Sequence, residues 1–321
     1  MFLDQVRNAW NRLRGIDPRD QPTIAGIFGH SRGGTNLIAA TLHYHPQIFS
    51  VTEHDIDHRV PLERYWKARS VFRIDGRQEK YIRQIRCVTF NKVQRDETLW
   101  GAGREYPAGT RFIFYLRNPL RVQSSREAYR RKRAPQRFDW ADTDQNFTAL
   151  LSEARGFIDA YQALKNRYPC LILTHEYYCC DYDEVLPHIH EFLGVASIPP
   201  SDPLKFFQEC GRCGRPFGRM EEMGQTWIAC PKHRNRVKGC GSFNPLRAVE
   251  QEGVLDTMWK DTPNAASRLQ QVADVLGQEI AAYYLNGDYT RNIPIDTQAS
   301  DVQPARCTKE FSAEDAEFAE T

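Results

Sequence analysis

The glycine-rich segment at residues 24–46 contains the groups best suited to chemistry. It reads IAGIFGHSRGGTNLIAATLHYHP, in which a short apolar run leads through a turn with Arg32 into apolar residues at helical spacing. Such a turn presents the first N–H groups of a helix, here those of Gly33, Gly34 and Thr35, beside the positive end of the helix dipole. The pattern therefore predicts a site for an oxyanion of phosphorus or sulfur, with Arg32 as its permanent positive charge.

Two other interpretations of this segment remain open at the level of its residues. Gly29 and Gly34 have the separation of the glycines in a Walker-type nucleotide-binding loop, but Thr35 stands where that motif requires lysine. A glycine-rich turn between a strand and a helix also occurs simply because it makes a tight corner. The segment alone does not choose between these interpretations.

A second candidate phosphate site follows the apolar run FIFYL at residues 112–116. This run is typical of a central parallel strand, and Arg117 comes directly after it, at the end where open α/β sheets bind ligands. Ser125 follows eight positions later, in the second turn of the next expected helix. A guanidinium and a hydroxyl in these places can share one phosphate. A nucleoside triphosphatase would usually carry a magnesium-binding aspartate where this chain has arginine.

Together the two segments resemble the signatures of sulfotransferases that use 3'-phosphoadenosine 5'-phosphosulfate (PAPS). In that family the first signature is a loop of the type R-S-G-T-T. The second signature comes later in the chain and is an arginine followed eight residues later by a serine, usually with N-P or D-P in between. Residues 32–36 and 117–125 occupy these places, the latter with Asn118-Pro119. Residues 171–195, which include LILTHEYY and EVLPHIHEFLGV, resemble the family's strand, acidic turn and following helix. The resemblance extends over roughly residues 22–195 in register.

The resemblance implies a role for each residue of the two signatures. The first would hold the 5'-phosphosulfate with Arg32, Gly33, Gly34, Thr35 and Asn36, and the second would hold the 3'-phosphate with Arg117 and Ser125. Gly33 replaces the usual serine, so one hydroxyl contact is missing and the backbone N–H must serve alone. Asn36 replaces the second threonine, and its amide can still donate to an oxyanion.

Sulfuryl transfer requires a positive clamp on the transferred group and a base for the acceptor hydroxyl. Arg32 is the expected clamp, because its guanidinium is permanently charged and can stabilise the transferred group without a magnesium ion. The resemblance implies Glu53 as the base, since a glutamate at this place has that role in the tyrosylprotein-type branch of the family. His54, Asp55 and His58 follow it directly and are the alternatives, and a solvated loop is the competing interpretation for all four residues.

A cysteine cluster lies later in the chain. Cys210 and Cys213 form a C-x2-C pair, and Cys230 opens the sequence C-P-K-H after sixteen further residues. These spacings predict a structural, tetrahedral zinc site of the zinc-ribbon kind. Cys240 is the preferred fourth ligand and His233 the alternative. Unligated thiols in an inserted segment are the competing interpretation.

The family resemblance also bears on other polar segments. A late K-G loop closes over the 3'-phosphate in the family, and Lys238 and Gly239 resemble it loosely. His175 and Glu176 correspond to a position that is usually structural, so we expect them outside the catalytic set. The basic run at residues 130–137 fits either a solvated helix end or recognition of an acidic acceptor.

The length of 321 residues, with 41% apolar and 26% charged content, suits one large domain or one domain with a sizeable insertion. We expect an amphipathic helix at residues 1–20 and a sulfotransferase domain at 21–292, with an α/β, P-loop-like three-layer fold around a central, mostly parallel sheet. The cysteine-rich zinc-binding insertion spans 205–245 of this domain. Residues 262–285 predict one long helix with an apolar stripe, and residues 293–321 predict a mobile acidic tail.

Charge and hydropathy narrow the possible partners. A net charge of +2 argues against nucleic acid. No apolar run approaches the roughly 20 residues that cross a bilayer, and the N-terminus lacks the apolar core of a signal peptide, so we expect a cytoplasmic protein. The odd number of nine cysteines fits reduced thiols or metal ligands. The N-terminal helix could at most make weak contact with a membrane surface.

The sequence therefore predicts a sulfotransferase that moves a sulfuryl group from PAPS to a hydroxyl or amine of a small-molecule or carbohydrate-like acceptor, giving adenosine 3',5'-bisphosphate. The alternatives are a P-loop-like small-molecule kinase and a non-catalytic nucleotide- or zinc-binding module. The acceptor and the oligomeric state stay open, because variable loops choose the acceptor in such folds.

Overall fold

The computed structural model describes residues 23–43, 45, 47–51, 85–93, 105–106, 109–197, 215, 218–222, 225–229, 231–232, 264–287 and 289–295. Its elements are β1 (Thr23–Gly29), α2 (Thr35–His43), β2 (Ile48–Val51), β3 (Cys87–Val93), β4 (Arg111–Leu116), α6 (Pro119–Arg133), the 3-10 helix η3 (Phe138–Trp140), α7 (Asp144–Leu164), β5 (Cys170–Thr174), α8 (His175–Cys180), α9 (Tyr182–Leu193), β6 (Gly218–Glu222), β7 (Gln225–Ala229), α11 (Ala265–Leu276) and α12 (Gln278–Asn286). The predicted helix at residues 1–20 and nearly all of the predicted tail lie outside these residues.

A five-stranded sheet in the order β2-β3-β1-β4-β5 forms the centre, and every neighbouring pair is parallel. The prediction of an α/β fold with a central parallel sheet is thus confirmed. The chain winds from β1 to β2 and β3 on one side and to β4 and β5 on the other, so the winding reverses between β1 and β4. Open α/β sheets bind ligands beyond the carboxyl ends of the strands at such a point.

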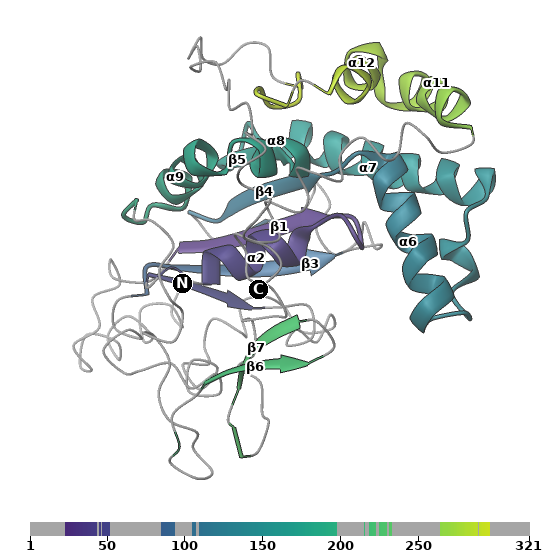
Figure 1. Ribbon diagram of the computed structural model, residues 1–321. Helices are drawn as coiled ribbons and strands as arrows, with labels where there is room; N and C mark the ends of the chain where they lie inside the picture. Colours follow the sequence, from purple (N-terminus) through teal and green to yellow (C-terminus); the bar gives the residue numbers. More distant parts are fainter. Residues whose placement is uncertain are drawn as a thin grey trace, which may run out of the picture.

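Helices cover both faces of the sheet and give three layers (Figure 1). Because neighbouring residues of a strand point to opposite faces, Phe28 and Phe114 face one core while Ile27 and Tyr115 face the other. The first core is closed by α7 and by the pair α11–α12, of which α11 packs on α7 and α12 reaches β5 through Tyr283 and Thr174. The second core is closed by α2 and α9. Helix α6 extends from the sheet edge where β4 ends.

The C-terminal helical region differs from the prediction of one long helix over 262–285. Two helices, α11 and α12, are separated at Gly277, because its φ of 110° and ψ of 153° lie far from helical values. The apolar stripe nevertheless packs on α7, so its burial was predicted correctly. Asn292 then covers the edge strand β5, because its Nδ2 donates to the carbonyl of Ile172 at 2.6 Å and its Oδ1 accepts from the N–H of Thr174 at 3.2 Å.

A second, two-stranded sheet lies within the predicted insertion. Strands β6 and β7 pair antiparallel, with Gly218 opposite Ala229 and Glu222 opposite Gln225.

No helix in the described part of the chain is long and apolar enough to span a membrane.

Candidate anion-binding site

The loop between β1 and α2 has the local structure of an anion-binding turn. Residues 31–34 form turns, and the first α2 backbone bonds run from Leu37 and Ile38 to the carbonyl of Gly34. The N–H groups at the start of α2 therefore precede the helical ladder and are oriented for an external acceptor. Gly34 has a φ of 88°, and a Cβ on it would collide with the ring of His175, so the loop needs glycine there on two counts.

One backbone donor is used differently from the prediction. The N–H of Gly33, which the sequence assigned to the anion, donates to the carbonyl of His30 at 2.8 Å. It closes the turn of the loop in this structure. The expected backbone contacts of the loop are therefore better supplied by Gly34 and Thr35 than by Gly33.

Arg32 connects the loop to α6. Its side chain is exposed, its Nε donates to Ser125 Oγ at 3.2 Å, and its guanidinium lies over the ring of Tyr129, 5.0 Å from the ring centroid. Its carbonyl accepts from an Nη of Arg117 at 3.1 Å. The two predicted phosphate sites, 93 residues apart at Arg32 and Ser125, therefore form one continuous surface.

Arg117 is held at the end of β4 by the turn that follows it. The side chain of Asn118 caps α6 by accepting from the N–H of Leu120 at 3.0 Å, and Pro119 supplies the first helical turn. The N–H of Asn118 donates to Glu176 Oε1 at 2.9 Å. Glu176 therefore supports the turn that carries Arg117, which agrees with its expected structural role.

His175 supports the other half of the site. Its ring lies against Gly34, and its Nδ1 is 2.9 Å from the hydroxyl of Tyr115, in a nearly solvent-free position. Burial, followed by the nearby Cys179, raises the pKa of Tyr115 well above its ordinary value, so the hydroxyl stays protonated. The carboxyl ends of β4 and β5 thus hold the loop through a buried hydrogen-bonded pair.

Sequence reasoning missed a buried ionic cluster behind the loop. Arg126 donates to the carbonyl of Ser31 at 3.2 Å and to Glu153 at 2.8 Å, and His30 lies 3.4 Å from the same carboxylate. Glu153 sits on α7 between the buried residues Leu150 and Phe157, at helical spacing from each. A carboxylate inside an apolar stripe was the available signal.

Several predicted site residues lie outside the described residues: Glu53, His54, Asp55, His58, Lys238, Gly239, Cys210, Cys213, Cys230, His233 and Cys240. Asn36 lies in the first turn of α2, as expected. Within the described residues no group of three or more metal-ligating side chains occurs. The predicted base, lid and zinc ligands therefore stay predictions.

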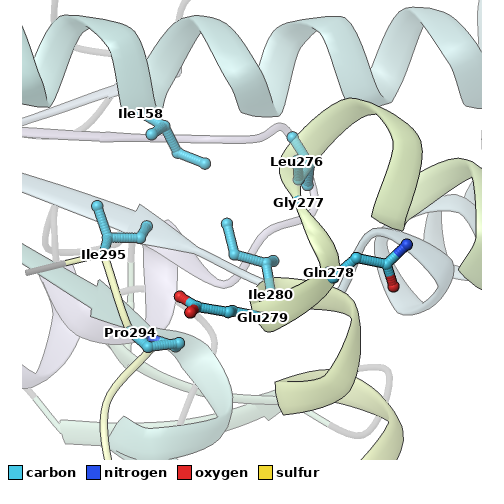
Figure 2. Close-up of a pocket in the computed structure, with 8 residues that line it drawn as sticks. All are labelled: Ile158, Leu276, Gly277, Gln278, Glu279, Ile280, Pro294 and Ile295. Atoms are coloured by element: carbon cyan, nitrogen blue, oxygen red, sulfur yellow. The ribbon is translucent and has the colours of Figure 1, made fainter. Parts of the chain in front are cut away.

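A separate hollow of about 370 Å³ lies between α7, the α11–α12 junction and residues 294–295. Figure 2 shows Ile158, Ile280 and Ile295 pointing into it, with Glu279 beside Pro294. None of its lining residues belongs to the loop or to α6.

No protein-family model and no curated protein sequence matches the chain. Similar solved structures, each 15% identical in sequence, include a sulfotransferase domain from the curacin biosynthetic pathway (TM-score 0.45; 79% of this chain and 97% of that one). Others are the sulfotransferase domain of the Synechococcus PCC 7002 olefin synthase (0.42; 80% and 95%) and mouse sulfotransferase SULT7A1 complexed with PAP (0.47; 83% and 89%). Likeness at this level does not assign the chain to a family.

Proposed function

We propose that this protein transfers a sulfuryl group from PAPS to a hydroxyl or amine of a small-molecule or carbohydrate-like acceptor. The observation that carries the proposal is the contact of Arg32 with Ser125 at 3.2 Å, beside Arg117. This contact brings the loop at the start of α2 next to Arg117 and Ser125, the two residues of the second predicted anion site. Both lie where the winding of the sheet reverses, between β1 and β4. Two adjacent anion sites on one surface suit a donor with a phosphosulfate and a separate phosphate.

The proposed roles follow from the chemistry of each group. The first turn of α2 and Arg32 would hold the phosphosulfate, and Arg117 and Ser125 the 3'-phosphate. The acceptor oxygen forms a bond to sulfur while the bond from sulfur to the bridging phosphate oxygen breaks, and adenosine 3',5'-bisphosphate leaves. Ser125 can accept from Arg32 and still donate to a phosphate, because a hydroxyl does both.

The acceptor's proton must go to a base, and we propose Glu53 for this role, with His54, Asp55 and His58 as alternatives. Strand β2 ends at Val51, two positions before Glu53 in the sequence, and it pairs parallel to β3, so its carboxyl end lies at the same edge of the sheet as the loop. We also propose that Lys238 and Gly239 contribute a contact to the 3'-phosphate. The variant Glu53→Gln lacks the carboxylate, so it should lower kcat by a larger factor than it changes the Kd of the donor.

Thermal unfolding tests the donor class directly. Adenosine 3',5'-bisphosphate should raise the melting temperature more than ATP with magnesium does. Ser125→Ala should reduce that shift, whereas Ser124→Ala, the exposed neighbouring hydroxyl on the same helix, should not. An equal or larger shift with magnesium ATP would favour a kinase. Donor binding without sulfation of any acceptor in a broad panel would favour the non-catalytic module.

We further propose a structural zinc ion bound by Cys210, Cys213, Cys230 and Cys240. Its support is the spacing of the cysteines together with the β6–β7 pair, in which Gly218, five residues after Cys213, lies opposite Ala229, the residue before Cys230. Purified protein should contain one zinc equivalent, measured by elemental analysis. Cys230→Ser should lose it, and Cys180→Ser, at an exposed cysteine, should keep it.

A further inference from the structure

Three elements meet at one carboxylate behind the anion-binding loop. Glu153 comes from α7, Arg126 from α6 and His30 from the residue after β1. Glu153 Oε2 is 2.8 Å from an Nη of Arg126 and 3.4 Å from His30 Nδ1. The side chains of His30 and Arg126 are 0% and 6% exposed, and that of Glu153 is 19% exposed. The cluster is thus a largely buried connection between the loop and two helices.

The charge of Glu153 is unexpected at this place. Burial pushes the pKa of Glu153 upward, but His30 and then Arg126 outweigh burial and hold the pKa at about 2. The group is therefore a carboxylate at neutral pH. A negative charge close behind an anion site repels the ligand, so electrostatics alone would disfavour a glutamate here.

The contacts of Arg126 show what this carboxylate does. The same guanidinium that binds Glu153 donates through Nε to the carbonyl of Ser31 at 3.2 Å. His30 also packs edge-on against Phe157 of α7, with ring centroids 5.2 Å apart. Arg117 holds the next carbonyl, that of Arg32. Three consecutive loop residues are therefore fixed from behind, directly before the N–H groups of the helix start.

We infer that Glu153 is a positioning residue of the anion site: through Arg126 and His30 it fixes the backbone at residues 30–32, so that the helix start and Arg32 face the ligand. The identity of the ligand rests on the proposed function. The anchoring itself does not, because it concerns contacts within the protein.

Glu153→Gln separates positioning from simple charge, because the two effects have opposite signs. If Glu153 positions the loop, the variant weakens binding of adenosine 3',5'-bisphosphate by about tenfold or more in titration calorimetry. If Glu153 acts only as a nearby negative charge, its removal tightens binding, and the inference is wrong. Asp159→Asn is the matched control, since that exposed carboxylate on α7 pairs only with exposed Arg155 among the described contacts.

Hydrogen exchange gives a readout that needs no ligand. Glu153→Gln should speed amide exchange across residues 30–36 by about tenfold, while Asp159→Asn leaves it unchanged. If wild-type protein does not bind the bisphosphate, the proposed function fails, but this measurement still decides the inference. A lower melting temperature with unchanged loop exchange and unchanged affinity would mean that Glu153 is merely structural.

Arg126→Lys provides a second variant in case Glu153→Gln does not fold. Lysine keeps the ion pair with Glu153 but is a point charge that cannot span both the carboxylate and the carbonyl of Ser31. It should reproduce the faster loop exchange and the weaker affinity. Wild-type values for both would overturn the inference.

Discussion

Arg32 is under backbone strain that its contacts hold in place. Its φ of 69° is in the left-handed region, which costs a non-glycine residue about 1–2 kcal/mol. The hydrogen bond from Arg117 to its carbonyl and the contacts of its side chain with Ser125 and Tyr129 offset this cost. In this conformation the guanidinium lies against Ser125 and Tyr129 of α6, on the surface that we propose for the donor. Strained residues of this kind concentrate at functional sites.

Arg32→Ala should lower kcat/KM for sulfuryl transfer by about 100- to 1,000-fold, because it removes a fixed charge from the transition state. Its melting temperature should fall only slightly, because the contacts with Ser125 and Tyr129 are lost but removal of an exposed side chain leaves no cavity. Release of adenosine 3',5'-bisphosphate under steady state measures the first and calorimetry the second. Arg155→Ala, an exposed arginine on α7, is the control. Near-normal turnover of Arg32→Ala would contradict the role of Arg32 as clamp.

At the scale of elements, the junction between α11 and α12 decides how the C-terminal segment closes the first core. Gly277 adopts a backbone conformation that is almost restricted to glycine, and this lets α12 turn back so that Ile280 and Tyr284 are buried. The hollow in Figure 2 lies at the same junction. The junction therefore contributes to stability and has no direct part in the anion site.

Gly277→Ala should destabilise the protein by about 1–3 kcal/mol, because a Cβ disfavours the observed backbone angles. Donor affinity measured at a temperature where the variant is folded should equal that of wild type. Gly156→Ala, within helical α7, is the matched control and should not lower stability, since alanine favours a helix. A loss of donor affinity in Gly277→Ala would show that the C-terminal helices reach the site.

At the scale of the whole molecule, acid stability depends on two buried histidines, one after α2 and one on α9, which lie side by side at the second core. His45, after α2, donates through Nε2 to the carbonyl of Ala196 at 2.8 Å, because its Nδ1 accepts from the N–H of Gln47. The ring of His190 on α9 lies 4.5 Å from it. Burial, followed by the neighbouring His45, lowers the pKa of His190 to about 4.

The free energy of unfolding should therefore fall as the pH drops from about 6.5 to about 4, by on the order of 2–3 kcal/mol. In this window the unfolded chain binds a proton at His190 and the folded chain does not, so acid favours unfolding. Urea titrations at several pH values measure the slope. His190→Gln should flatten it, and His188→Gln, at an exposed position on the same helix, should not. An unchanged slope in His190→Gln would assign the acid sensitivity elsewhere.

Much of the architecture could be predicted because it depends on local patterns. The runs at β1 and β4 are continuous and apolar, as buried parallel strands require, and the cap at Asn118-Pro119 marks the start of α6. The break at Gly277 was missed, since the apolar stripe continues across it at helical spacing. A glycine within such a pattern is usually tolerated, and only the packing of α12 shows that the helix ends there.

The sequence alone determined which groups could bind anions, because glycine-rich helix starts and arginines at strand ends have that property wherever they occur. Tertiary structure decided that Arg32, Arg117 and Ser125 share one surface, since the pairing of β1 with β4 places them there. It also decided that Gly33 closes the turn and that Glu153 lies behind the loop. These contacts join residues far apart in the chain, and no local pattern encodes such distances.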